Sequence, residues 1–161
     1  MRKLQKGFSL IELLIVVAII LIIAAIAIPN LLRSRMAANE ASAVGSLRTI
    51  NTAEVTYSTT YPTIGFAALA SLGGTAAACS SATGATSTTA CLIDDVLATS
   101  AVKSGYNFAA TAGGGVPAVT YASTASPSVP GQSGQRYFCS DQSGVIRYNA
   151  TTACANTDAS L

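Results

Sequence analysis

The stretch KGFSLIELLIVVAIILIIAAIAIPN, residues 6–30, decides the fold of this chain of 161 residues. Every residue from Leu13 to Ile28 is apolar, and the segment from Phe8 to Ile28 is 21 residues long. A helix of that length extends roughly 31 Å, close to the hydrocarbon thickness of a bilayer. A single segment can satisfy its backbone hydrogen bonds in lipid only as a helix. The stretch therefore predicts a membrane-spanning helix over residues 8–28.

The residues before this helix are basic. Residues 1–7, MRKLQKG, carry Arg2, Lys3 and Lys6 and no acidic residue. A basic flank stays in the cytoplasm, so the chain after the helix is expected outside it. A secretory signal cleaved near Ala27, and a plain signal anchor, are alternatives for such a start. Glu12 is unexpected in both, because a carboxylate within an apolar run costs free energy.

Beyond Pro29 the sequence predicts that the helix continues through the segment 29–60. The helical pattern itself extends to about Tyr57. Pro29 has no backbone N–H, so we expect the helix to be bent or interrupted there. Apolar residues then recur at steps of three and four, as in an amphipathic helix that packs on a core. This stripe consists of Ala43, Leu47, Ile50, Ala53 and Tyr57. Arg48 and Glu54 are expected on other faces of the helix.

Residues 61–161 are expected to form a small globular head, which makes the fold class α+β. GFAALASLGG, residues 65–74, predicts a short helix that ends at two glycines. Alternating apolar residues between turn sequences predict four antiparallel strands in sequential order. They lie in SGYNFAA (104–110), PAVTYAS (117–123), QRYFCS (135–140) and GVIRYN (144–149). The tail NATTACANTDASL is expected to be coil.

The four cysteines all lie in the head and predict two disulfides. They are Cys79, Cys91, Cys139 and Cys154. None forms a CxxC pair, so a zinc or redox site is not indicated, and disulfides suit a segment outside the cytoplasm. Three connectivities are open, of which the sequence-local one is favoured, and buried free thiols are the alternative. A bridge between the last two cysteines would add roughly 3 kcal/mol in the loop-closure model.

The composition argues against an enzyme. The chain has no His, and its charged residues make up only 10% of the total. The commonest general base and metal ligand is therefore missing, and no catalytic residue, metal or cofactor is predicted. Asp94, Asp95 and Asp141 are too few and scattered to predict a calcium site. A net charge of +2 gives no argument for a specific nucleic-acid partner.

The start of the chain resembles a type IV prepilin of the IVa class. The residues that carry the resemblance are Gly7, Phe8 and Glu12, which is the fifth residue counted from Phe8. Pro29 falls where the family has its helix-breaking proline. The sequence resemblance is strong over residues 1–60. Beyond them, only the expected architecture is similar. It implies the pilin fold, in which a long N-terminal helix packs on a small antiparallel sheet.

The resemblance also implies a processing reaction and an assembly contact. A prepilin peptidase would cut between Gly7 and Phe8, remove the leader 1–7 and N-methylate Phe8. Glu12 would then pair with the Phe8 amine of a neighbouring subunit, which would fix the axial register of the helices. The alternative for Glu12 is an interfacial carboxylate that reaches the cytoplasmic side of the membrane. Pro29 would mark a point where the helix unwinds during assembly. The alternative for Pro29 is a simple boundary between the membrane helix and the periplasmic helix.

The expected function is that of a structural subunit of a type IV pilus, serving motility, adhesion or DNA uptake. Its partners would be other copies in a helical homopolymer, the prepilin peptidase and an inner-membrane assembly platform. Inner-membrane lipid would surround the helix before assembly, and the mature filament would be extracellular. The alternative is a major pseudopilin of a type II secretion system, which shares the leader. The cysteines favour the pilin.

Overall fold

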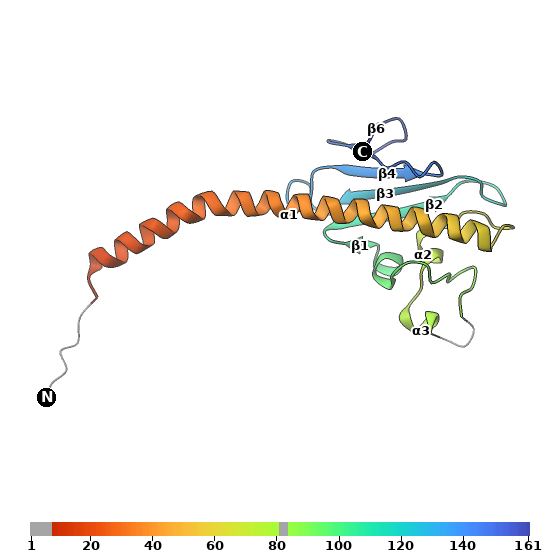
Figure 1. Cartoon of the computed structure of the whole chain (residues 1–161), viewed down its shortest axis with the longest axis horizontal. Helices are drawn as coiled ribbons and strands as arrows, with labels where there is room; N and C mark the ends of the chain where they lie inside the picture. The colour runs from red at the N-terminus through yellow and green to blue at the C-terminus, as the bar shows by residue number, and fades with distance from the viewer. Residues whose placement is uncertain (1–7, 81–83) are drawn as a thin grey trace. The chain divides into compact units, whose positions relative to one another are not determined.

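The computed structural model describes residues 8–80 and 84–161. The expected leader 1–7 lies outside the described residues. The chain divides into two compact units, Met1–Arg35 and Met36–Leu161. The longest element, α1 (Leu10–Thr60), supplies most of the first unit and one side of the second (Figure 1).

The helix α1 is continuous over 51 residues and includes Pro29. The expected interruption at this proline is therefore absent. Proline costs a helix one backbone hydrogen bond and crowds the preceding turn, but intact turns on both sides can carry it. The helix ends at Thr60, the last residue of the expected segment 29–60, and Tyr61 N–H still donates to the Tyr57 carbonyl at 2.8 Å.

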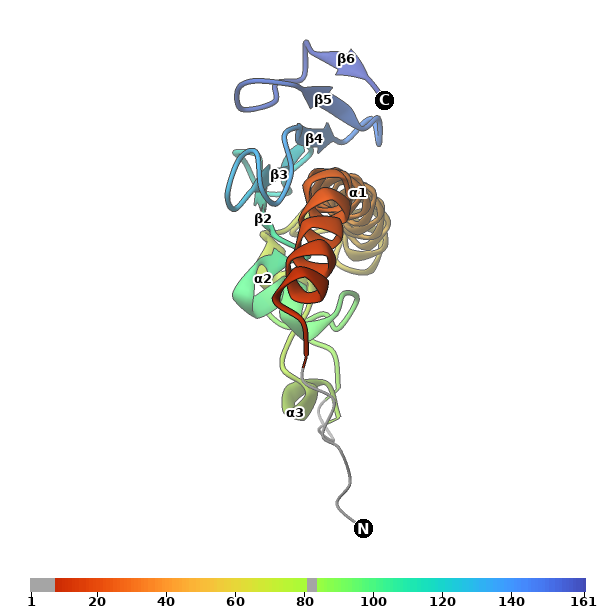
Figure 2. The same cartoon turned by 90° about the vertical axis from the view of Figure 1, so that its left-hand side faces the viewer.

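The second unit contains a six-stranded antiparallel sheet in the order β1-β2-β3-β4-β5-β6. The strands β2 to β5 confirm the predicted antiparallel hairpins and their sequential order. Figures 1 and 2 show the later strands on one side of α1, and α2 and α3 on the other. The strands are β1 (Val102–Lys103), β2 (Tyr106–Ala112), β3 (Tyr121–Pro127), β4 (Tyr137–Asp141), β5 (Arg147–Asn149) and β6 (Ala159–Ser160).

Two details of the predicted sheet are wrong. The tail is not all coil, because Ala159 and Ser160 pair with β5 as an edge strand of two residues. So short a strand has no alternation that a sequence pattern could reveal. The second predicted strand begins late, at Tyr121, and Val119 lies in the preceding loop with 70% of its surface exposed.

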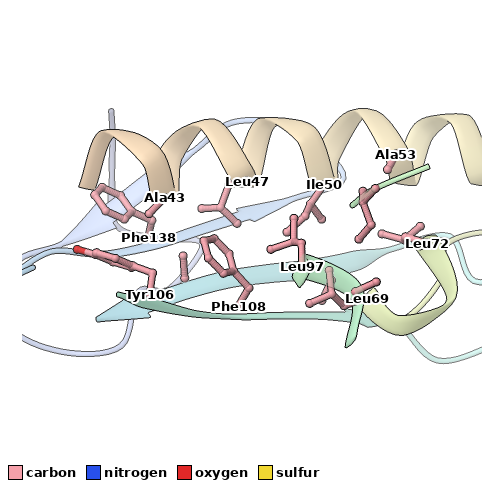
Figure 3. Close-up of a cluster of buried hydrophobic side chains, with 14 of the residues drawn as sticks. Ala43, Leu47, Ile50, Ala53, Leu69, Leu72, Leu97, Tyr106, Phe108 and Phe138 are labelled. Carbon is pink, nitrogen blue, oxygen red and sulfur yellow. The ribbon is translucent and has the colours of Figure 1, made fainter. Parts of the chain in front are cut away.

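The core forms where the apolar stripe of α1 meets β2. All five stripe residues are buried, as the spacing predicted. Tyr106, Phe108 and Ala110 alternate along β2 and are buried, and Tyr106 and Phe108 point toward α1 (Figure 3). Each large side chain buried in this way contributes about 1.5–3 kcal/mol. Leu72 and Leu97, from two short helices, close the far end of the same cluster.

In its described residues, the segment between α1 and the sheet holds three short helices and one disulfide. They are α2 (Leu69–Leu72), α3 (Ala76–Cys79) and the π-helix η1 (Val96–Ser100). The helix α2 lies within the predicted 65–74 segment and ends before Gly73. Cys79 is bonded to Cys91, with the two Cα atoms 5.7 Å apart. This bridge ties down a stretch of small polar residues that has little to bury.

The second disulfide joins Cys139 of β4 to Cys154 in the segment between β5 and β6, with a Cα–Cα distance of 5.5 Å. Both bridges thus have the sequence-local connectivity. The Cys139–Cys154 bridge closes a loop with a sequence separation of 15 residues. It holds the C-terminal segment next to β4.

Glu54 corrects one expectation about α1. The sequence placed it on another face, but its side chain is 0% exposed and its Oε2 accepts the N–H of Ala67 at 3.0 Å. The spacing explains the error, since Glu54 follows Ile50 by four residues and precedes Tyr57 by three. It therefore belongs to the stripe itself. Burial raises the pKa of Glu54 to about 7, although the Ala67 hydrogen bond opposes this shift.

A buried polar cluster fixes α1 against β3 and β4. The Asn51 amide donates from Nδ2 to Ser140 Oγ at 2.8 Å, and its Oδ1 accepts the Tyr121 hydroxyl at 3.0 Å. All three side chains are buried. An unsatisfied buried polar group costs about 1–3 kcal/mol. A shift of α1 along the sheet would break these hydrogen bonds, so they fix the axial position of the helix.

Candidate assembly site

Both residues of the expected assembly pair lie at the start of α1. Glu12 occupies the third helical position, and its Oε2 accepts the backbone N–H of Ser9 at 3.0 Å. This contact is one half of a capping box. A carboxylate here also faces the positive end of the helix dipole. Within a single chain, Glu12 therefore stabilises its own helix start.

The same carboxylate keeps one oxygen free for a second contact. Among residues 8–80 and 84–161, no group donates a hydrogen bond to Oε1 of Glu12. The residue is exposed, and so is Phe8, with 76% of its surface accessible. Within residues 8–80 and 84–161, no hydrogen bond or ion pair joins Phe8 to Glu12. The expected pair between subunits stays a prediction.

The apolar half of α1 presents an uninterrupted hydrophobic surface. Its large apolar side chains from Leu10 to Leu32 are all 42% exposed or more. The most apolar window of 18 residues has a mean hydropathy of 3.3, and none of it is buried within the chain. Among the described residues, α1 is the one helix long and apolar enough to cross a membrane. A continuous apolar surface of this kind marks a membrane or protein contact.

The other residues singled out from the sequence lie apart from this helix start. Gly7, the expected last leader residue, lies outside the described residues. Pro29 is exposed within α1. The described residues hold no cluster of three or more His, Cys, Asp or Glu side chains that could bind a metal ion. Asp94 instead pairs with Lys103 at 2.6 Å, and this hydrogen bond lowers the pKa of Asp94.

The comparisons with known proteins concern the same end of the chain. Residues 2–28 match the family model of the prokaryotic N-terminal methylation motif. The chain is similar to type IV pilins over part of its length. It is 69% identical over 35 residues to the type IV wide pilus major component PilA4 of Thermus thermophilus. It is also 54% identical over 52 residues to the type IV major fimbrial protein FimA of Dichelobacter nodosus.

A third relative, the type IV major pilin protein PilA of Myxococcus xanthus, is 45% identical over 53 residues. The matches to PilA4, PilA and FimA cover 22%, 33% and 30% of this chain. They span 27%, 24% and 33% of the three relatives. No solved structure matches the chain significantly. The three matches thus cover at most a third of this chain, and the relatives do not favour the pseudopilin alternative.

One contact between α1 and the head was not foreseen. Glu40 Oε2 accepts a hydrogen bond from Arg136 Nε at 2.7 Å, and its Oε1 accepts the N–H groups of Gln135 and Arg136. Burial alone would raise the pKa of Glu40, but these three donors outweigh it and lower the pKa. Because Glu40 and Arg136 are 96 residues apart, no local sequence pattern could have paired them.

Proposed function

We propose that this chain is the structural subunit of a type IV pilus, made as an inner-membrane precursor and polymerised through its N-terminal helix. The observation that carries the proposal is the methylation motif over residues 2–28, which includes an apolar helix whose large side chains stay exposed within residues 8–80 and 84–161. Bilayer lipid would cover this helix in the precursor, and neighbouring copies would cover it in the filament. Open filaments arise from head-to-tail contacts that do not close into a ring.

The proposed processing step changes the charge at the start of α1. Hydrolysis of the Gly7–Phe8 peptide bond by a prepilin peptidase would consume water and release residues 1–7, with their three basic side chains. It would leave a protonated amine on Phe8. Transfer of a methyl group from a sulfonium methyl donor to this amine would release a thioether and one proton, and the resulting secondary ammonium keeps the positive charge. The cut thereby creates a cation four residues before Glu12.

The free oxygen of Glu12 is where the amine of a neighbouring subunit would bind. Oε2 stays with Ser9 of its own chain, while Oε1 accepts the new cation. In an apolar filament core an unpaired charge would be costly, so copies would be held at the one axial offset that pairs them. The apolar side chains supply adhesion, and this charge pair selects the register. The use resembles a buried polar residue that sets the register of a coiled coil.

The relatives include a pilus component, a pilin and a fimbrial protein, which supports the pilus over the secretion pseudopilus. Surface filaments of this kind would serve motility, adhesion or DNA uptake. An inner-membrane assembly platform would add the subunits. Deletion of the gene is expected to abolish long surface filaments and to leave protein secretion intact. Loss of secretion with normal filaments would instead identify a pseudopilin.

The Gly7→Ala variant tests processing. We expect it to retain residues 1–7 and to form no filaments, because the amine of Phe8 is never released. Intact mass and N-terminal sequencing of the protein in membranes and in sheared filaments measure this directly. Wild-type protein from sheared filaments should begin with methylated Phe8. Mature-length protein and normal filaments from the variant would refute the processing step.

Two substitutions of Glu12 separate its roles. Glu12→Gln keeps an oxygen that can accept the Ser9 N–H but removes the charge, whereas Glu12→Leu removes both. If charge pairing sets the register, both variants should be processed yet give few or no filaments in electron micrographs. If Glu12 acts only as a helix cap, Glu12→Gln should assemble like wild type. That second result would refute the register role and leave the processing step standing.

A further inference from the structure

We propose that Arg33 and Arg35 bind the phosphate groups of anionic phospholipids in the outer leaflet of the inner membrane. The contact would exist while the chain is still a membrane precursor, so it rests on the proposed function. Both residues lie on the first unit, shortly after the apolar run ends at Ile28. The proposed partner is a lipid surface. The positive charge of the two guanidinium groups and their distance from the end of the apolar run favour this partner.

Their position along α1 matches the depth of the headgroups. Arg33 follows Ile28 by five residues and Arg35 by seven, which is about 7.5 and 10.5 Å along a helix. The headgroup layer adds roughly 5–7 Å on each side of the hydrocarbon. Long basic side chains reach back toward the membrane along apolar surface. Both guanidinium groups can therefore lie among the lipid phosphates.

Both guanidinium groups are free to take such partners. Arg33 and Arg35 are exposed, and neither forms a hydrogen bond or ion pair within residues 8–80 and 84–161. Arg136, by contrast, is paired with Glu40 in the head. Arginine also binds phosphate bidentately, which a compact lysine ammonium does not.

The arrangement around the helix favours a lipid surface over a single protein partner. Two residues along a helix are separated by about 200° around its axis, so the two arginines point to nearly opposite sides. One flat protein surface cannot meet both side chains, whereas headgroups surround the helix. A groove lined by Ile28, Leu31, Leu32 and Arg35 adds an apolar floor beneath one guanidinium. That combination suits the amphiphilic character of a phospholipid.

The proposal gives processing a second consequence. Before the cut, Arg2, Lys3 and Lys6 hold one end of the helix at the cytoplasmic leaflet. After the cut these charges are gone, and Arg33 and Arg35 remain as the basic flank on the opposite side. The stronger electrostatic attraction between the chain and anionic lipid is then at the outer leaflet and no longer at the cytoplasmic leaflet. The outer leaflet is the side from which a subunit must leave.

The test measures lipid preference around the full, unprocessed chain. Wild type, the double variant R33Q/R35Q and the control R48Q are reconstituted in phosphatidylcholine vesicles at low protein density. Spin-labelled phosphatidylglycerol and spin-labelled phosphatidylcholine report how strongly each lipid associates with the protein. Arg48 is a suitable control because it is an exposed arginine on α1, 20 residues beyond Ile28 and thus about 30 Å past the apolar run. A variant with Arg2, Lys3 and Lys6 replaced by Gln removes the contribution of the opposite leaflet.

We expect the preference for phosphatidylglycerol to fall in R33Q/R35Q by up to about fivefold for each arginine, and to stay at the wild-type level in R48Q. The same loss should appear in the leader variant and should shrink at high salt. Inorganic phosphate, at ionic strength matched with sodium chloride, should compete no better than the salt. An unchanged preference in R33Q/R35Q, or an equal loss in R48Q, would overturn the proposal.

Two further outcomes identify other occupants. If the effect of R33Q/R35Q grows with protein density and chemical crosslinking yields dimers, the arginines contact a second copy and the lipid proposal fails. If the wild-type chain does not float with vesicles, the membrane precursor itself is wrong. Retained flotation with no headgroup preference would refute this inference alone. Circular dichroism and intact disulfides confirm that each variant is folded.

Discussion

Replacement of Glu54 by glutamine should make the stability of the head nearly independent of pH between about 5 and 8. The pKa of this buried carboxyl rises from an ordinary 4.5 to about 7 in the folded chain. The folded state therefore holds a proton that the unfolded state has released across this range. Stability is highest below about pH 4.5 and falls as the pH rises through about 7, by about 3 kcal/mol in total.

The glutamine variant keeps an oxygen for the Ala67 N–H but cannot ionise. For a head of this size, 3 kcal/mol corresponds to a loss of about 10 °C in Tm for wild type between pH 5 and pH 8. Glu54→Gln should lack this loss, although its unpartnered amide costs about 1 kcal/mol at every pH. The variant should thus be the less stable protein at pH 5 and the more stable one at pH 8. Thermal unfolding in detergent, followed by near-ultraviolet circular dichroism of the tyrosines, measures both.

Glu40→Gln serves as the matched control because its carboxyl titrates in the opposite sense. The Gln135 and Arg136 donors lower the pKa of Glu40, so its contribution is present above the ordinary pKa and is lost on acidification. This variant should be destabilised at pH 5 and at pH 8 and should keep the wild-type decline between them. The chain has no His that would titrate in the same range. Parallel Tm curves for wild type and Glu54→Gln would refute the reasoning.

Two substitutions in the head should lower its stability for different reasons. Gly65 has a φ of +82°, and a Cβ there would overlap the backbone of Ala118, so Gly65→Ala should cost about 2 kcal/mol or more. A Tm within about 2 °C of wild type would contradict that close approach. Cys139→Ser with Cys154→Ser should cost roughly 3 kcal/mol and lower the denaturant midpoint without removing the sheet. Equal midpoints for the oxidised and reduced wild-type chain would count against it.

The sequence predicted those parts of the structure that have a local period. The stripe from Ala43 to Tyr57 and the alternation of Tyr106 and Phe108 both lie where the pattern placed them. The apolar run of α1 was equally easy to assign, since a continuous apolar run of that length is typical of a membrane-spanning helix. Patterns of this kind locate elements and the faces that they bury.

Contacts between distant polar residues could not be predicted in this way. No sequence pattern singled out Asn51 or Ser140, and Tyr121 was assigned to the apolar face of a strand. Only the fold brings the three together. Glu54 was misplaced because its charge was taken to exclude it from the buried face, although its spacing fitted that face. At the start of α1, the pattern indicated that Glu12 had a partner. The Ser9 N–H that it accepts within its own chain became apparent only from the structure.

In the proposed filament, the polar contacts of α1 with the head have a mechanical consequence under tension. Glu40, Asn51 and Glu54 contact the head at points spread over 14 residues, or about 21 Å along the helix. A force along the helix axis loads these contacts in shear, so they resist together, whereas a sideways force would peel them apart one after another. The head should thus withstand axial tension far better than lateral bending. A retracting or dragged fibre would load its subunits with axial tension of this kind.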